Sequence, residues 1–233
     1  VPQNLFGKFV LARCAGLASG SVRSNWDAYL RRALFVIGAT PVPGADEATA
    51  LRFLVPEAAD PGYDWLTRLS PGDSLNFLGP FGRDADLGAH ARRLLLVSAI
   101  ADAPLLIPLA DRMLDQGGRV AFIVRGPSAD RSLLSLLPLD VELHMAESDE
   151  QYHAFLGDAM RWSDALVVCE SAMSPRELAG EMQKHRLSSE YDYAQILMRA
   201  DYVCGAGACM ACVVQRSDGS LTRACVHGPV FPL

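Results

Sequence analysis

Four of the six cysteines of this 233-residue chain lie close together near its C-terminus, in the pattern C-x4-C-x2-C-x12-C. They are Cys204, Cys209, Cys212 and Cys225. The residues between the first two, at positions 205–208, are all glycine or alanine. Such a segment can wrap closely around a bound group, because glycine reaches positive φ values and alanine adds only a methyl group. The pattern restricts the C-terminal region to folds that bring four thiol groups together.

The spacing C-x4-C-x2-C is typical of the ligands of plant-type [2Fe-2S] clusters. Backbone N–H groups of a loop of small residues would moderate the negative charge of such a cluster. Two alternatives stay open. Structural zinc usually takes two C-x2-C-like pairs, and disulfides need an oxidising compartment, of which the sequence gives no sign. We predict a [2Fe-2S] cluster with four ligands, Cys204, Cys209, Cys212 and Cys225.

The composition is that of an ordinary globular protein and excludes several other classes. Of the residues, 50% are hydrophobic and 21% are charged, and the net charge is -6. A disordered chain would be less hydrophobic, and a nucleic-acid-binding protein would normally show a basic stripe, which this sequence lacks. The apolar runs are far shorter than the roughly 20 residues that span a bilayer. No signal peptide is recognisable, so we expect a cytoplasmic protein without membrane insertion.

Three regions of different pattern follow one another along the chain. Residues 1–88 hold short apolar runs between Gly/Pro turns, which is typical of an antiparallel β-barrel or sandwich. Residues 89–197 alternate between apolar strands and helical spacing, which favours a doubly wound parallel sheet. Residues 198–233 form a small tail that carries the cysteine pattern. We predict an α/β plus β fold with three domains at these boundaries.

The apolar runs and the helical periodicity also predict individual elements. Strands are expected at residues 9–11, 34–37, 51–55, 75–78, 94–98, 119–124, 141–145 and 165–169. Helices are expected at residues 104–114, 152–160 and 175–185, and a short helix or turn at 133–137.

The C-terminal sequence TRACVHGPVF, at positions 222–231, resembles the end of the electron-transfer subunit of two-subunit, NAD-linked dihydroorotate dehydrogenase. That family is part of the ferredoxin-NADP reductase superfamily. Its domain order, a flavin-binding barrel, a nucleotide-binding α/β domain and a [2Fe-2S] domain, is the order of the three regions here. The sequence LFGKFV at 5–10 and the WL, PGD and GPxG elements at 65–82 also resemble the family. The resemblance implies that the first barrel strands lie upstream of Val1 or on another chain.

At the flavin site the resemblance implies one retained residue and one departure. In the family pattern R-R-P-[IFL]-S-I the arginine reaches the flavin pyrophosphate and the serine meets the isoalloxazine ring; this chain reads RRALFV at 31–36. Arg32 retains the arginine, whereas Phe35 replaces the serine and cannot hydrogen-bond the ring. The turn whose backbone approaches a pyrophosphate corresponds to Gly79, Pro80 and Gly82. A solvated surface arginine and a plain connecting turn are the alternatives for these residues.

The nucleotide-binding motifs depart further from the family. Where the family has the glycine-rich turn G-G-G-x-G-x-A-P, this chain reads VSAIADAP at 97–104. Asp102 places a negative charge near the position of a pyrophosphate, which is an unfavourable pairing. The later signature that contacts nicotinamide keeps Cys169 and Met173, but Glu170 replaces its glycine. We therefore predict that NAD binding is weakened or lost.

Two functions of different class agree with these residues. The first is an electron-transfer subunit that passes electrons between FAD and the [2Fe-2S] cluster to a catalytic partner, as the dihydroorotate dehydrogenase of pyrimidine biosynthesis does. The second is a non-catalytic iron-sulfur subunit of a larger redox complex that has lost NAD binding, with or without FAD binding. A hetero-oligomer is expected in both cases, and no catalytic acid, base or nucleophile is expected in either.

Overall fold

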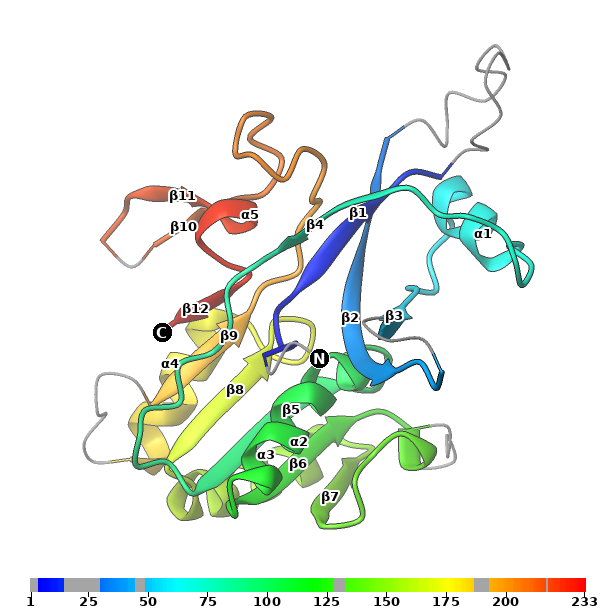
Figure 1. Cartoon of the computed structure of the whole chain (residues 1–233). Helices are drawn as coiled ribbons and strands as arrows, with labels where there is room; N and C mark the ends of the chain where they lie inside the picture. The colour runs from blue at the N-terminus through cyan, green and yellow to red at the C-terminus, as the bar shows by residue number, and fades with distance from the viewer. Residues whose placement is uncertain (1–3, 15–29, 45–48, 128–132, 187–192, 217) are drawn as a thin grey trace.

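The computed structural model describes residues 4–14, 30–44, 49–127, 133–186, 193–216 and 218–233. They form an antiparallel sheet, a mainly parallel sheet and a two-stranded ribbon (Figure 1). In the described part of the chain, none of the helices has the length and hydrophobicity needed to cross a bilayer.

The antiparallel sheet is made by the first part of the chain, as predicted. Its strands are β1 (Phe9–Ala12), β2 (Arg32–Pro41), β3 (Thr49–Leu54) and β4 (Phe77–Phe81), in the order β3-β2-β1-β4. The fourth strand lies two residues later than predicted, because its register is set by pairing with β1, where Phe77 lies opposite Ala12. Whether further strands close this sheet into a barrel stays a prediction.

One short helix in this region was not predicted. Helix α1 (Pro61–Thr67) begins after Asp60, whose carboxylate accepts hydrogen bonds from the N–H groups of Gly62 and Tyr63. Asp60-Pro61-Gly62 has the composition of a turn, but Asp is also a favoured N-cap and Pro a favoured first helical residue. The Asp60 carboxylate therefore caps the free N–H groups at the N-terminus of α1.

The second sheet has the order β12-β9-β8-β5-β6-β7. Its five neighbouring parallel strands are β5 (Arg93–Ala99), β6 (Arg119–Arg125), β7 (Val141–Ala146), β8 (Ala165–Cys169) and β9 (Ala194–Leu197). The inner strands β5 and β8 are almost wholly buried, as expected of a sheet covered on both faces. The predicted parallel sheet is confirmed.

Helices cover both faces of this sheet, so it is doubly wound as predicted. Helix α2 (Ile107–Asp115) packs on the face of Leu94 and Leu96, whereas α3 (Asp149–Trp162) and α4 (Pro175–His185) pack on the face of Leu95 and Val97. Burying one such leucine contributes roughly 1.5–3 kcal/mol, so this pattern fixes which residues point to which side.

The helix expected at 104–114 differs from the observed structure. The chain forms a 3₁₀ helix at Ile100–Leu106 before α2 begins at Ile107. Pro104 lies inside the 3₁₀ helix and Pro108 at the first turn of α2. Because proline lacks an N–H group and clashes with the preceding turn, a continuous α-helix through both prolines is disfavoured.

The C-terminal segment folds around the cysteines and then returns to the parallel sheet. It contains β10 (Val213–Gln215), β11 (Leu221–Arg223), α5 (Ala224–His227) and β12 (Val230–Pro232). Strand β12 pairs antiparallel with β9, and the N–H of Arg83 donates to the carbonyl of Gly228 at 2.7 Å. One hydrophobic core continues through the three regions, from Phe9 of β1 to Leu96 of β5 and Cys225 of α5.

Candidate metal centre

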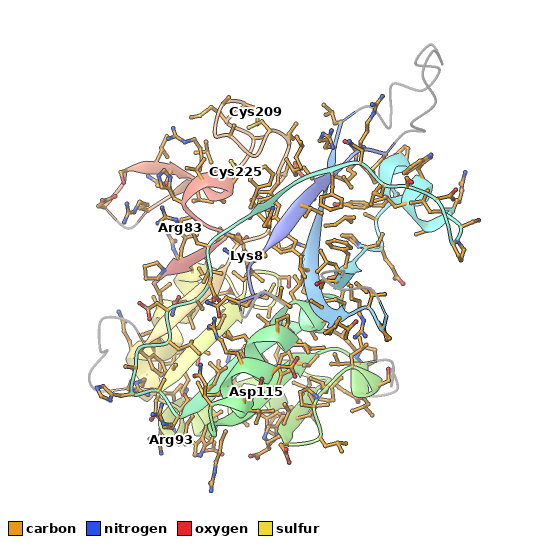
Figure 2. The ribbon with its side chains drawn as sticks, in the orientation of Figure 1. Lys8, Arg83, Arg93, Asp115, Cys209 and Cys225 are labelled. Carbon is orange, nitrogen blue, oxygen red and sulfur yellow. The ribbon has the colours of Figure 1, made fainter. Side chains whose placement is uncertain are left out.

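The four predicted ligand cysteines all lie in the lobe formed by the segment between β9 and β12, where Figure 2 labels two of them, Cys209 in the loop and Cys225 in α5. Cys212 and Cys225 are buried, Cys204 is half-buried and Cys209 is exposed. No disulfide joins them, because all six cysteines of the chain are free thiols. The lobe thus has an inner and an outer side with thiols on each.

The four thiols are arranged in two pairs. On the inner side, the N–H of Cys225 donates to Sγ of Cys212 at 3.4 Å, and the N–H of Ala224 donates to the carbonyl of Cys212 at 2.8 Å. On the outer side, Cys204 and Cys209 interact directly, and the N–H of Ala206 donates to Sγ of Cys204 at 3.4 Å. Each pair is therefore held by backbone hydrogen bonds as well as by chain connectivity.

The pKa of one thiol in each pair is shifted, downward for Cys204 and upward for Cys225. Backbone N–H groups, that of Cys209 first and that of Ala206 next, lower the pKa of the Cys204 thiol to about 6. Burial, together with the neighbouring Cys212 thiol, raises the pKa of Cys225 to about 11. A metal centre would deprotonate Cys225 on binding, because thiolates and not thiols are metal ligands.

Two glycines make the tight course of the loop possible. Gly205 and Gly207 have φ values of 67° and 71°, which L-residues with side chains rarely adopt. A Cβ atom on Gly205 would lie 2.7 Å from Cζ of Phe81, and one on Gly207 would lie 2.9 Å from Cγ2 of Val226. The loop therefore packs directly on β4 and α5 through its glycine backbone.

An unpaired donor beside the loop favours a bound anionic group. The Nε atom of Arg223 is buried and has no hydrogen-bond partner among the described residues. It would lie 3.3 Å from a Cβ atom on Gly207. Leaving a buried charged donor without a partner is costly, and a cluster with four thiolate ligands is anionic.

The donor set fits a two-iron cluster. Among the described residues, no three His, Cys, Asp or Glu side chains converge closely enough to hold a single metal ion. A [2Fe-2S] cluster asks for a different arrangement, in which each iron takes two thiolates. The pairs Cys204/Cys209 and Cys212/Cys225 offer that arrangement. Beside this segment, Nδ1 of His227 lies 2.9 Å from the Thr222 hydroxyl.

Sequence reasoning missed a row of aromatic rings that starts at the cysteine loop. The ring of Phe81 lies against Gly205, and its centroid is 5.7 Å from that of Phe9. Phe9 in turn lies 5.4 Å from Phe35 and 4.5 Å from Tyr202. No local pattern signals this row, because its members come from β1, β2, β4 and the segment after β9. The row extends from the loop to Phe35, the residue at the position that meets the flavin ring in the family.

The predicted flavin-phosphate arginine has a partner within the chain. Nε of Arg32 lies 2.7 Å from Oδ1 of Asp60, and this pairing is the main cause that lowers the pKa of Asp60. Both side chains are largely buried. Arg32 also covers Gly62, where a Cβ atom would lie 2.8 Å from Nε. A carboxylate of the chain thus occupies the anion position beside Arg32.

The predicted pyrophosphate turn lies at the other end of β1 from Arg32. Arg32 is opposite Ala12, whereas Phe81, within the turn sequence Gly79 to Gly82, is opposite Phe9. Gly82 has a φ of 97°, and a Cβ there would lie 2.1 Å from the carbonyl oxygen of Gly7. The Lys8 ammonium donates to the Gly82 carbonyl at 2.6 Å. Arg32 and Phe81 of the turn sequence therefore pair with opposite ends of β1.

The residues after β5 do not fit a dinucleotide. A dinucleotide pyrophosphate needs glycines between the strand and the helix and free N–H groups at the helix start. Here Val97, Ser98, Ala99 and Ala101 take the glycine positions, and the 3₁₀ helix follows the strand at once, with a buried Asp102 in its first turn. The predicted obstacle is therefore present in the structure.

A cavity of about 640 Å³ lies elsewhere, between β2, β3 and α2. Its lining includes Arg52, Asp111 and Asp115, the last of which is labelled in Figure 2, and none of the predicted site residues.

Comparison with known proteins agrees with the sequence-based resemblance. Residues 202–233 match the family model of the iron-sulfur cluster binding domain of dihydroorotate dehydrogenase B. The electron transfer subunit of dihydroorotate dehydrogenase B (NAD(+)) from Desulforamulus reducens is 26% identical, over 97% of this chain and 84% of that protein. The protein of the same name from Streptococcus thermophilus is 25% identical, over 72% of this chain and 67% of that protein. The resemblance is therefore confirmed.

Solved structures show the same fold. The NADH-dependent reduced ferredoxin-NADP oxidoreductase, described in connection with flavin-based electron bifurcation, superimposes with a TM-score of 0.64 at 20% identity, over 97% of this chain and 77% of that one. A siderophore-interacting protein from Acinetobacter baumannii gives a TM-score of 0.54 at 14% identity, over 83% of this chain and 76% of that one.

Proposed function

We propose that this chain is an electron-transfer subunit that carries electrons between a flavin and a [2Fe-2S] cluster and passes them to a partner oxidoreductase, as in dihydroorotate dehydrogenase B. The observation that carries the proposal is the match of residues 202–233 to the iron-sulfur domain of that enzyme, in a lobe that pairs four thiols. Under this proposal the protein works in the cytoplasm, in pyrimidine biosynthesis, within a hetero-oligomer.

The division of the chain follows the same proposal. Residues 1–88 form a flavin-binding barrel, residues 89–197 a reductase-like α/β domain, and residues 198–233 the cluster domain. When bound, the cluster supplies one-electron transfer and the flavin converts two-electron chemistry into such steps. Four thiolates hold the cluster: those of Cys204, Cys209, Cys212 and Cys225. The loop N–H groups and the Arg223 guanidinium offset its negative charge.

The lobe also separates the cluster from solvent on one side only. Cys212 and Cys225 are buried against the protein, whereas Cys209 is exposed, as is Met210 beside it. The exposed side is where a partner can approach closely enough to exchange electrons. The ring of Phe81 packs against the loop at Gly205 and contacts Phe9 behind it.

For the flavin, we propose that Arg32 meets the pyrophosphate, and that Gly79, Pro80 and Gly82 form the family's turn whose backbone approaches a pyrophosphate. The structure favours a second candidate at this point. Asp60 already neutralises Arg32, and Phe35 takes the place of the serine that meets the flavin ring. A non-catalytic iron-sulfur subunit of a larger redox complex that has lost NAD binding, with or without FAD binding, is therefore the alternative.

Analysis of the purified native protein tests the proposal directly. We expect two irons and two acid-labile sulfides per chain, cluster absorbance bleached by dithionite, and flavin absorbance from bound FAD. The measurements are iron and sulfide assays, an absorbance spectrum and flavin extraction. A cluster without flavin would favour the alternative subunit. Absence of both would contradict each of the two functions.

Removing the charge of Asp60 should strengthen FAD binding. We expect Asp60→Asn to raise the affinity for FAD by about tenfold, because a flavin phosphate would no longer compete with a carboxylate for Arg32. Asparagine is an equally good helix N-cap, so α1 should persist. Affinity is measured by quenching of flavin fluorescence during titration.

Asp64→Asn is the matched control. Asp64 lies in the first turn of α1, so the change removes one negative charge there, but the carboxylate that pairs with Arg32 is that of Asp60. Affinity in this control should match the wild type. An Asp60→Asn protein that binds FAD no better than the control would show that Arg32 is not a phosphate ligand.

A further inference from the structure

The carboxyl ends of β5 and β8 form the place where an open α/β sheet usually binds its ligand. From β5 the chain continues to β6 on one side, whereas β8 and β9 lie on the other, so the strand order reverses between β5 and β8. In sheets of this kind, the crevice outside such a reversal is the common ligand site. What fills it here decides what the α/β domain can bind.

One arginine occupies this crevice. The guanidinium of Arg199, just after β9, forms an ion pair with Asp102, just after β5. The N–H of Arg199 donates to Oε2 of Glu170, just after β8, at 3.1 Å. The carboxylates of Asp102 and Glu170, one in each of the two altered family motifs, therefore both contact Arg199. Asp102 pairs with its guanidinium and Glu170 accepts from its backbone N–H.

Arg199 also reaches the antiparallel sheet. Its Cζ atom lies 5.8 Å from the ring centroid of Phe35 on β2. Three residues later, Tyr202 packs on Phe9 at 4.5 Å between ring centroids and donates its hydroxyl to the carbonyl of Met198 at 2.9 Å. The segment that leads into the cysteine loop is thus fixed to both sheets at the point where they meet.

The charges show why this contact is more than a surface ion pair. The Asp102 side chain is 13% exposed and that of Arg199 30%. Loss of one partner would leave a largely buried charge without compensation, which is strongly unfavourable. A dinucleotide pyrophosphate at this point would have to compete with Asp102 for the Arg199 guanidinium, and it would face the carboxylates of Asp102 and Glu170.

We infer that Arg199, with Asp102 and Glu170, closes the crevice in place of a dinucleotide and fastens the cluster segment to the parallel sheet. The α/β domain is then an anchor for the cluster lobe and not a binding domain for NADH. This goes beyond the proposed electron-transfer role, because it concerns a different site and holds with or without bound flavin.

A double-mutant cycle on the native holoprotein tests the fastening. Arg199→Gln and Asp102→Asn should each speed hydrogen–deuterium exchange in the peptide spanning 195–203 by at least tenfold. The double variant should exchange no faster than either single variant, because both changes break one contact. Effects that add up, or exchange at the wild-type rate, would overturn the inference. The iron content of these variants should stay at the wild-type value. Failure of this inference can therefore be told apart from failure of the cluster assignment.

Arg93→Gln is the matched control. It breaks an Arg–Asp pair with Asp164 at the opposite, amino-terminal end of β5, where Figure 2 labels Arg93. Exchange in the 195–203 peptide should not change in this variant.

A second measurement uses NADH itself as the probe. Equilibrium dialysis of the holoprotein should show no saturable binding up to about 1 mM NADH, and exchange at 98–104 and 169–173 should not slow. Saturable binding with protection of both segments would show that the crevice opens for the dinucleotide, and the inference would fall.

Discussion

Replacing either Cys209 or Cys212 by serine should remove the iron from this protein. We expect the iron and sulfide content of Cys209→Ser and of Cys212→Ser to fall by about tenfold or more from two of each per chain. Each change deletes one member of a different thiol pair, and serine is a poor ligand for the iron of such clusters. The measurement is iron and acid-labile sulfide analysis after anaerobic purification, with the electron paramagnetic resonance signal of the reduced protein.

Cys14→Ala is the control for loss of a buried thiol. Cys14 lies in a small core cluster with Val10 and Leu66, away from the loop, and burial raises the pKa of its thiol. This variant should lose some stability but keep its full iron load. Two irons and two sulfides in both serine variants would show that the ligands have been assigned wrongly.

The parts of the fold that could be predicted are those whose signal is local. Residues 94–98 and 165–169 are continuous apolar runs because they are buried on both faces of the sheet, and the structure has β5 and β8 there. The helix predicted at 175–185 has these bounds in the structure, where Ser174 and Glu177 form a capping box at its start.

The parts that could not be predicted depend on contacts between distant residues. Strands β9 and β12 have four and three residues, too short for a periodicity, and they are defined by pairing: β9 with β8, and β12 with β9. The same reason hid the partner of Asp102, since Arg199 lies 97 positions away. The sequence marked Asp102 and Glu170 as anions at unfavourable positions, and only the fold shows that Asp102 pairs with the Arg199 guanidinium and that Glu170 accepts from the Arg199 N–H.

The candidate site divides in the same way. The thiol pattern and the small residues between Cys204 and Cys209 are adjacent in sequence, so they could be recognised together. Arg32 and Gly82 were grouped by resemblance alone, and the strand register separates them along β1. The aromatic row through Phe9 and Phe81 needs four segments to meet, which no local pattern could show.

A methyl group on Gly205 should disrupt the cluster loop. We expect Gly205→Ala to lose most of its iron and to lower the melting temperature, for two reasons. An alanine at a φ of 67° costs roughly 1–2 kcal/mol. Its Cβ would also lie 2.7 Å from the Phe81 ring, which packs on Phe9 and has little room to move. Iron analysis and thermal unfolding measure the two effects.

Gly219→Ala separates the two causes, because it carries the backbone strain without the clash. Gly219 also has a positive φ, 80°, but no described atom lies within 4 Å of the position of its Cβ. This variant should therefore lose some stability and retain its iron. The double variant Gly205→Ala/Phe81→Leu should regain part of the iron that Gly205→Ala loses, because a smaller side chain then faces the new methyl group. If Gly205→Ala behaves like Gly219→Ala, the packing of Phe81 on the loop does not hold the cluster site in shape.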